Sequence, residues 1–219
     1  MTELFFVDLK KSDFTNYDEE NFNENFPESL AEKIKKTKNE KLRKDRIAVY
    51  TVLIDILSKK EEKKKVFSNF AFTEKGKPYL KNSDVYFSVS HTDGLGVIAI
   101  SNTAVGVDVE KIIEEKRETV EKICDKFNLP KHDFEVDTIK NVNYCLVYPE
   151  KNETNQILTE NINANEVRFS FFRWTNFEAR LKLNGNGFSE IQKTLNGNAF
   201  VKSYLFSIED SDFAVSVAG

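Results

Sequence analysis

Hydrophobic and polar positions alternate in a way that predicts both strands and helices in the first half of the chain. Residues 4–9 form a short apolar run typical of a strand. Residues 28–59 carry apolar side chains at helical spacing in two segments, the first of them rich in lysine. Three alternating segments follow, and the short turns between them predict an antiparallel meander, because such turns cannot cross over to a parallel strand. These segments are residues 85–91, 97–100 and 105–110.

The second half predicts two further helices and a strand-rich tail. Residues 112–127 form an amphipathic helix, and residues 169–183 form an aromatic-rich helix that ends at Asn184-Gly185. Between them, residues 140–165 are rich in asparagine and read as an insertion or a loosely ordered hairpin. In the tail, Asn196-Gly197 is a good hairpin turn between two of the two or three expected strands.

Composition and charge narrow the class of protein. The chain has 219 residues and a formal charge of −4, which excludes a general polyanion binder and gives no reason to expect a nucleic-acid partner. No apolar run approaches the roughly 20 residues of a membrane helix, and the N-terminus lacks the basic region of a signal peptide. We therefore expect a cytoplasmic protein with no membrane contact, whose Cys124 and Cys145 are reduced and form no zinc site.

An internal echo suggests two related halves. Residues 87–93, Phe-Ser-Val-Ser-His-Thr-Asp, resemble residues 206–212, Phe-Ser-Ile-Glu-Asp-Ser-Asp, and apolar alternation follows both segments. The echo fits two similar α+β halves packed together, with Asp210 in the place of His91.

Asp108 and Glu110 are candidate metal ligands. They lie two residues apart on an expected strand, so both side chains point to one face. Two neighbouring carboxylates repel each other, and a hard cation such as Mg²⁺ relieves that repulsion. The alternative is a solvated strand edge.

Glu178 and Lys182 are a second candidate pair, four residues apart on one face of the expected aromatic-rich helix. An acid and a base on a largely buried helix need partners, which a metal and a phosphate would supply. The alternative is a surface ion pair.

Ser90 and His91, at a strand end, could bind a phosphate with the turn amides, or His91 could be a structural histidine. Lys77 lies in a stiff Gly-Lys-Pro turn.

Four motifs in order resemble those of the 4′-phosphopantetheinyl transferases. They are Gly-Lys-Pro-Tyr at residues 76–79, Phe-Ser-Val-Ser-His at 87–91, Gly-Val-Asp-Val-Glu-Lys at 106–111 and Trp-Thr-Asn-Phe-Glu-Ala-Arg-Leu-Lys at 174–182. The larger, two-halved type that activates surfactin-like peptide synthetases is the more similar one. This resemblance implies an α+β fold of two similar halves related by pseudo-two-fold symmetry. We place the halves at residues 1–104 and 105–219, the latter containing the insertion, and expect a monomer.

The resemblance also implies the reaction. Such an enzyme uses Mg²⁺ and coenzyme A as co-substrate. It transfers the 4′-phosphopantetheine arm to a serine of an acyl or peptidyl carrier protein of fatty-acid, polyketide or nonribosomal peptide biosynthesis, and releases 3′,5′-ADP. Asp108, Glu110 and Glu178 would be the metal carboxylates. Glu178 would also activate the carrier serine, directly or through water, and Lys182 would hold the pyrophosphate.

The remaining roles concern coenzyme A. His91, which completes the catalytic set, would bind the phosphates together with Ser90. Lys77 would flank the nucleotide, and Arg46 matches a basic position near it. Lys33 and Lys36 match a lysine pair that reaches the phosphates.

One departure from the family pattern keeps an alternative open. Phe177 stands where the family has a lysine before the helix glutamate, which removes a cation expected near the phosphates. A degenerate paralogue that binds coenzyme A as a non-catalytic partner or regulator is therefore the main alternative. A Mg²⁺-dependent phosphohydrolase would need further clustered metal ligands, and a purely structural α+β domain would leave the ordered motifs as coincidence.

Overall fold

The structure, a computed structural model, describes residues 2–11, 22–129, 143–147, 152–153, 166–185, 191, 194, 197 and 199–219. Its strands are β1 (Glu3–Asp8), β2 (Phe70–Phe72), β3 (Pro78–Leu80), β4 (Tyr86–Thr92), β5 (Leu95–Ser101), β6 (Gly106–Lys111), β7 (Asn143–Val147), β8 (Asn152–Glu153), β9 (Val201–Ile208) and β10 (Ser211–Ala218). Its helices are α1 (Phe22–Asn25), α2 (Glu28–Lys35), α3 (Glu40–Lys60), α4 (Lys63–Asn69), the 3₁₀ helix η2 (Glu114–Lys116), α5 (Arg117–Lys126) and α6 (Glu166–Asn184).

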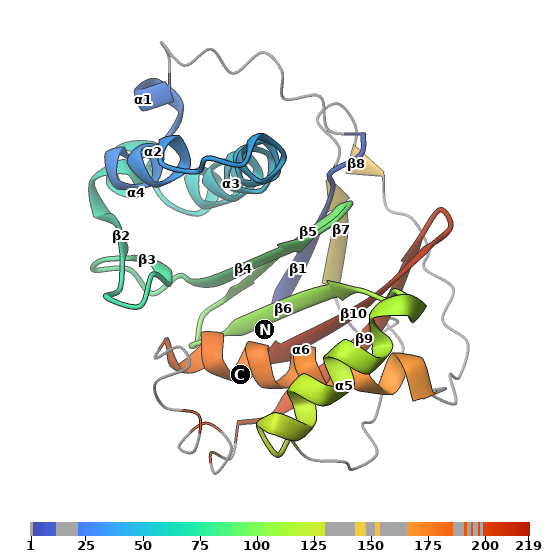
Figure 1. The fold of residues 1–219 in the computed structure, drawn as a ribbon. Helices are drawn as coiled ribbons and strands as arrows, with labels where there is room; N and C mark the ends of the chain where they lie inside the picture. Colours follow the sequence, from blue (N-terminus) through green and yellow to red (C-terminus); the bar gives the residue numbers. More distant parts are fainter. Residues whose placement is uncertain are drawn as a thin grey trace.

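Two sheets packed face to face form the centre of the molecule, and helices cover their outer faces (Figure 1). The larger sheet has the order β4-β5-β1-β7-β8, the second sheet has the order β6-β10-β9, and β2 pairs with β3 alone. Between the two main sheets, the rings of Phe6 and Phe206 stack with centroids 4.3 Å apart. The prediction of a mixed α+β protein is therefore confirmed, whereas the pseudo-two-fold symmetry stays a prediction.

Helices α2 and α3 confirm the two helical segments expected over residues 28–59. The side chain of Asn39 accepts a hydrogen bond of 2.9 Å from the backbone of Leu42 and so caps the start of α3. Both helices bury apolar side chains such as Leu30 and Leu53 against the larger sheet. No helix in the described part of the chain is long and apolar enough to cross a membrane.

The predicted meander is only partly correct. β4 and β5 form the expected antiparallel hairpin, but β6 leaves it and pairs with β10 in the second sheet. The physical reason is that both edges of β5 are already occupied, by β4 on one side and by β1 on the other. The strand β6 therefore lies across the interface between the two main sheets from β5. Its polar residues Asp108 and Glu110 belong to the second sheet.

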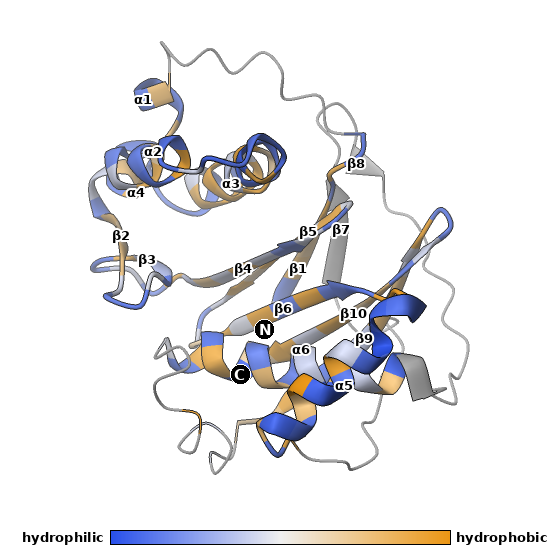
Figure 2. Ribbon diagram, in the orientation of Figure 1, coloured by the Kyte–Doolittle hydropathy of each residue, from blue (hydrophilic) through white to orange (hydrophobic). Residues whose placement is uncertain are grey.

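In the second half, the helix predicted over residues 112–127 is confirmed as η2 followed by α5. Helix α6 ends as predicted, because Gly185 adopts a positive φ of 69° and its amide donates to the carbonyl of Leu181. Figure 2 shows that α5 is largely hydrophilic, with isolated hydrophobic residues. The tail forms a β9–β10 hairpin that turns after Ile208, while Asn196 lies outside the described residues.

The described part of the asparagine-rich segment is a hairpin, as predicted, of β7 and β8. The strand β7 also pairs in parallel with β1, which local sequence patterns did not indicate. The division of the chain at residue 104 stays a prediction.

Candidate active site

A cavity of about 350 Å³ lies where α2, α3, β4 and α6 meet near the turn before β3. Its described lining contains four lysines and one arginine but only one acidic side chain, that of Glu178. The cations are Lys33, Arg46, Lys75, Lys77 and Lys182. Such an excess of positive charge in a concave site favours a ligand with several negative charges, for example a nucleotide with phosphates.

A buried polar triad lies at one end of this cavity. Lys182 Nζ lies 2.6 Å from Asp108 Oδ1 and 2.9 Å from Ser90 Oγ, and the Ser90 hydroxyl donates to the same carboxylate oxygen at 2.8 Å. The other oxygen of Asp108 is buried without a hydrogen-bond partner. The structure thus joins three of the residues that the sequence singled out, from β4, β6 and α6.

Close packing brings these elements together. The Ser88 side chain on β4 accepts a hydrogen bond of 3.0 Å from the backbone of Val107 on β6. Gly106 of β6 lies against α6, and a Cβ added to it would lie 2.1 Å from the carbonyl oxygen of Ala179. The glycine of the Gly-Val-Asp-Val-Glu motif is therefore required because the helix backbone lies directly on it.

Burial and mutual repulsion perturb the other two acids. Burial, and then the charge of Asp108, raises the pKa of Glu178 to about 7. The same two causes raise the pKa of Glu110 to about 7. The Thr92 hydroxyl donates to Glu110 at 3.4 Å. Both acids are thus poised near neutral pH, as expected for groups at a functional site.

The chemistry of these donors fits a hard divalent cation. The unpartnered oxygen of Asp108 and the carboxyl groups of Glu110 and Glu178, whose pKa values are raised, are the kind of oxygen ligand that Mg²⁺ prefers. Among the described residues, however, no group of three His, Cys, Asp or Glu side chains is already arranged to hold a metal ion. Lys182 occupies one oxygen of Asp108 instead. The assignment of Asp108, Glu110 and Glu178 as metal ligands stays a prediction.

The raised pKa values predict how stability depends on pH when no divalent cation is present. The ordinary pKa of both glutamates is 4.5 and their folded pKa is about 7, so the folded protein holds protons that the unfolded chain releases. Their contribution to the free energy of unfolding is full below pH 4.5 and is lost as the pH rises through 7. We expect the melting temperature in chelator to fall over this window, and Glu110→Gln to flatten the fall. Equal slopes for wild type and variant would contradict the prediction.

His91 and Arg46 both line the cavity, and their assignment to coenzyme A stays a prediction. Burial lowers the pKa of His91 to about 4, so its imidazole is neutral at pH 7 and offers one N–H donor rather than a charge. Arg46 donates a hydrogen bond of 2.7 Å to the Thr37 hydroxyl, which holds the guanidinium at the cavity wall.

The three lysines predicted to bind the nucleotide differ in their placement. Lys77 Nζ donates to the carbonyls of Val105 and Leu183, each at 3.1 Å, and burial lowers its pKa to about 8. Lys33 donates to the carbonyl of Gly76 at 3.0 Å. Both therefore also hold the Gly-Lys-Pro turn in place. Lys36 does not line the cavity, and its side chain pairs with Glu32 on the surface.

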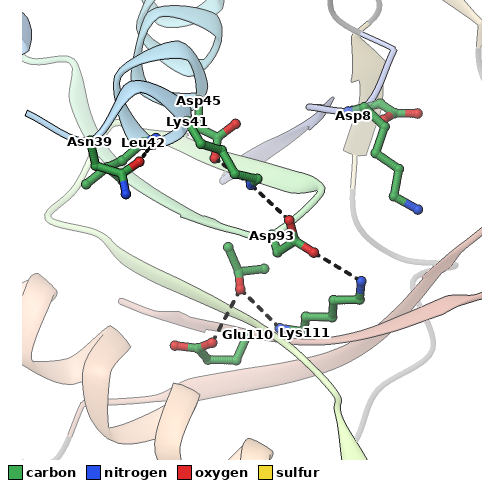
Figure 3. Close-up of polar contacts among 10 residues, drawn as sticks. Asp8, Asn39, Lys41, Leu42, Asp45, Asp93, Glu110 and Lys111 are labelled. Atoms are coloured by element: carbon green, nitrogen blue, oxygen red, sulfur yellow. Dashed lines mark hydrogen bonds and ion pairs between the residues drawn. The ribbon is translucent and has the colours of Figure 1, made fainter.

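Sequence reasoning missed two cavity residues and a charged network. Lys75 and Tyr50 line the cavity; the spacing of Tyr50 four residues after Arg46 on α3 was the available signal. Asp93 forms ion pairs with Lys41 at 2.8 Å and with Lys111 at 3.3 Å. Figure 3 shows it between these two lysines, close to Glu110. This network links α3 to β6 beside the site.

Phe177 does not face the cavity. Its side chain is 2% exposed and packs between α5 and α6, with ring centroids 6.0 Å from Phe127 and 6.1 Å from Trp174. The expectation that this departure from the family pattern removes a cation near the phosphates is therefore not supported by the position of the side chain.

A lysine at position 177, as in the family that the motifs resemble, should destabilise the protein. Phe177→Lys places an ammonium in the apolar α5–α6 contact, and we expect it to lower the free energy of unfolding by about 3–5 kcal/mol without increasing the affinity of the cavity for a phosphorylated ligand. Thermal unfolding and calorimetry of coenzyme A binding check this, with Phe177→Leu as the matched control. A stable Phe177→Lys protein that binds coenzyme A clearly more tightly would show that position 177 does reach the phosphates.

Comparison with known proteins gives one partial similarity. No protein-family profile matches the chain. A segment of 45 residues is 47% identical to the protein named 4'-phosphopantetheinyl transferase gsp of Aneurinibacillus migulanus. The matched segment covers 20% of this chain and only 19% of that protein. The similarity thus suggests, in general terms, a relationship to phosphopantetheinyl transferases.

Proposed function

We propose that this protein transfers the 4′-phosphopantetheine arm of coenzyme A to a serine of an acyl or peptidyl carrier protein, with Mg²⁺ as the metal. The observation that carries the proposal is the cavity with five cationic side chains and one acid, next to the Asp108–Lys182 pair. Coenzyme A has the matching chemistry, because its pyrophosphate and 3′-phosphate place several negative charges beside an adenine. The partial similarity to a named transferase supports the same reaction class.

Glu178 and Lys182 have separate roles in the proposed transfer step. The carrier serine oxygen attacks the phosphorus that bears the pantetheine arm, and the bond from that phosphorus to the bridging pyrophosphate oxygen breaks. The released 3′,5′-ADP keeps the bridging oxygen and the electron pair. Glu178 takes the serine proton directly or through water. Lys182 stabilises the charge that develops on the leaving phosphate.

A bound Mg²⁺ would neutralise the pyrophosphate charge. Asp108, Glu110 and Glu178 would hold it. Arg46, Lys33 and His91 would hold the nucleotide end of coenzyme A, because they line the same cavity. Positioning and charge neutralisation supply most of the rate enhancement in phosphoryl-type transfer, so no covalent enzyme intermediate is needed.

Release of 3′,5′-ADP tests the proposal. The protein is incubated with coenzyme A, Mg²⁺ and apo forms of fatty-acid, polyketide and peptide-synthesis carriers, and the nucleotide product is separated by chromatography. We expect release that requires a carrier with its serine intact; the matched control is the same carrier with that serine replaced by alanine. Calorimetry of coenzyme A binding is run in parallel. Binding without release by any carrier would favour the non-catalytic paralogue instead.

A further inference from the structure

A row of buried polar side chains crosses the second sheet beside the candidate site. Asp108 on β6 lies directly opposite Ser216 on β10, and Ser216 lies directly opposite Ser203 on β9. Residues opposite each other in antiparallel strands share a face, so all three point toward α6 rather than into the core between the sheets. All three are buried: Asp108 is 5%, Ser216 0% and Ser203 1% exposed.

The two serines of this row connect to α6 through hydrogen bonds. Ser203 Oγ lies 2.8 Å from Ser216 Oγ, which in turn lies 2.8 Å from Thr175 Oγ1. The Thr175 hydroxyl also lies 3.4 Å from the backbone carbonyl of Phe172, to which it can donate. The three hydroxyls thus form a continuous hydrogen-bonded chain from β9 through β10 to α6.

Thr175 shares a helix face with the two reactive residues of α6. Glu178 is three residues and Lys182 is seven residues further along, which corresponds to about 4.5 Å and about 10.5 Å along the helix axis. On the same helix, Phe171 and Phe172 make apolar contacts with Ala214 of β10. Apolar contacts have no preferred direction, whereas hydrogen bonds do. The hydroxyl chain is therefore a directional contact between this part of α6 and strands β9 and β10, and β10 pairs with β6, which carries Asp108.

We propose that Ser203, Ser216 and Thr175 are positioning residues. They fix the rotation of α6 about its axis and its distance from the second sheet, so that Lys182 and Glu178 lie next to Asp108. The effect on the reaction rests on the proposed function, but the structural effect does not. A displacement of α6 by about 1 Å would be enough to lower the rate of a reaction that depends on orientation.

A triple variant, Ser203→Ala with Thr175→Val and Ser216→Ala, tests the proposal. It removes every hydroxyl of the chain at nearly constant volume and leaves no partner of the chain unsatisfied, so folding should be maintained. We expect kcat to fall about tenfold and the KM for coenzyme A to change less than about twofold. Thr175→Ser keeps the hydroxyl and should retain wild-type kinetics. Ser68→Ala is the matched control, because Ser68 lies exposed on α4 and its hydroxyl donates to the carbonyl of Lys65 in the same helix.

A crystal structure of the triple variant separates positioning from activity. The proposal requires that Lys182 Nζ and Asp108 Oδ1, 2.6 Å apart in the native protein, separate beyond hydrogen-bond distance. An unchanged distance overturns it, whatever the kinetics. If the wild type transfers no arm to any carrier, the proposed function fails, while the measured distance still decides whether the hydroxyl chain positions α6.

Discussion

Replacing Glu178 by glutamine should lower transfer at least about 1,000-fold while the chain stays folded. The amide has nearly the shape of the carboxyl group but can neither take a proton from the carrier serine nor supply a negative metal ligand. No described hydrogen bond holds the Glu178 side chain, and burial beside Asp108 raises its pKa to about 7. Removing this charge should therefore also raise the melting temperature at pH 8 in the absence of metal.

The Glu178→Gln test uses initial rates of transfer and thermal unfolding on the same preparation. Glu118→Gln is the matched control, because Glu118 lies exposed on α5 and pairs only with Lys122 among the described ion pairs. A Glu178→Gln rate within a few-fold of wild type would mean that neither the base nor the metal ligand has been assigned correctly.

Gly106→Ala should lower the free energy of unfolding by about 2–4 kcal/mol and the transfer rate about 100-fold. The new Cβ would lie 2.1 Å from the carbonyl oxygen of Ala179 and 2.4 Å from the backbone nitrogen of Leu183. Backbone atoms cannot rotate out of the way, so α6 must move away from β6. That movement carries Lys182 away from Asp108, since the two residues lie on these two elements.

Gly96→Ala is the matched control for Gly106→Ala. Its new Cβ would meet a side-chain atom of Val49 on α3, not the backbone of α6. We expect it to lose stability while keeping its activity per folded molecule within about threefold. The measurements are chemical denaturation and initial rates; Gly106→Ala with the wild-type rate would show that the contact of α6 with β6 does not place the site.

Local patterns were sufficient to predict the elements that carry the chemistry. The spacing of Glu178 and Lys182 predicted one helix face, and the Asn184-Gly185 pair predicted where α6 ends. The alternation around Asp108 and Ser90 placed both residues on strands. The family resemblance, rather than the local pattern, brought these residues together, and the structure places Lys182, Ser90 and Asp108 in direct contact.

What could not be predicted depends on contacts between distant segments. The sequence gives no local sign that β6 pairs with β10 instead of β5, because that choice depends on β1 occupying the edge of β5. The position of Phe177 depends on the packing of α5 against α6, not on its place in a motif. The hydrogen bond between Thr175 and Ser216 joins α6 to β10, so it also could not be predicted without the strand register.

The intact mass of an apo carrier protein tests the central claim most directly. The carrier is incubated with coenzyme A, Mg²⁺ and this protein, with and without a chelator, and with Glu178→Gln in place of the wild type. We predict a mass increase of one phosphopantetheine arm with the wild type and Mg²⁺ alone, and none with the chelator or the variant. An unmodified carrier of every class, from a preparation that still binds coenzyme A, would contradict the claim that this site transfers the arm.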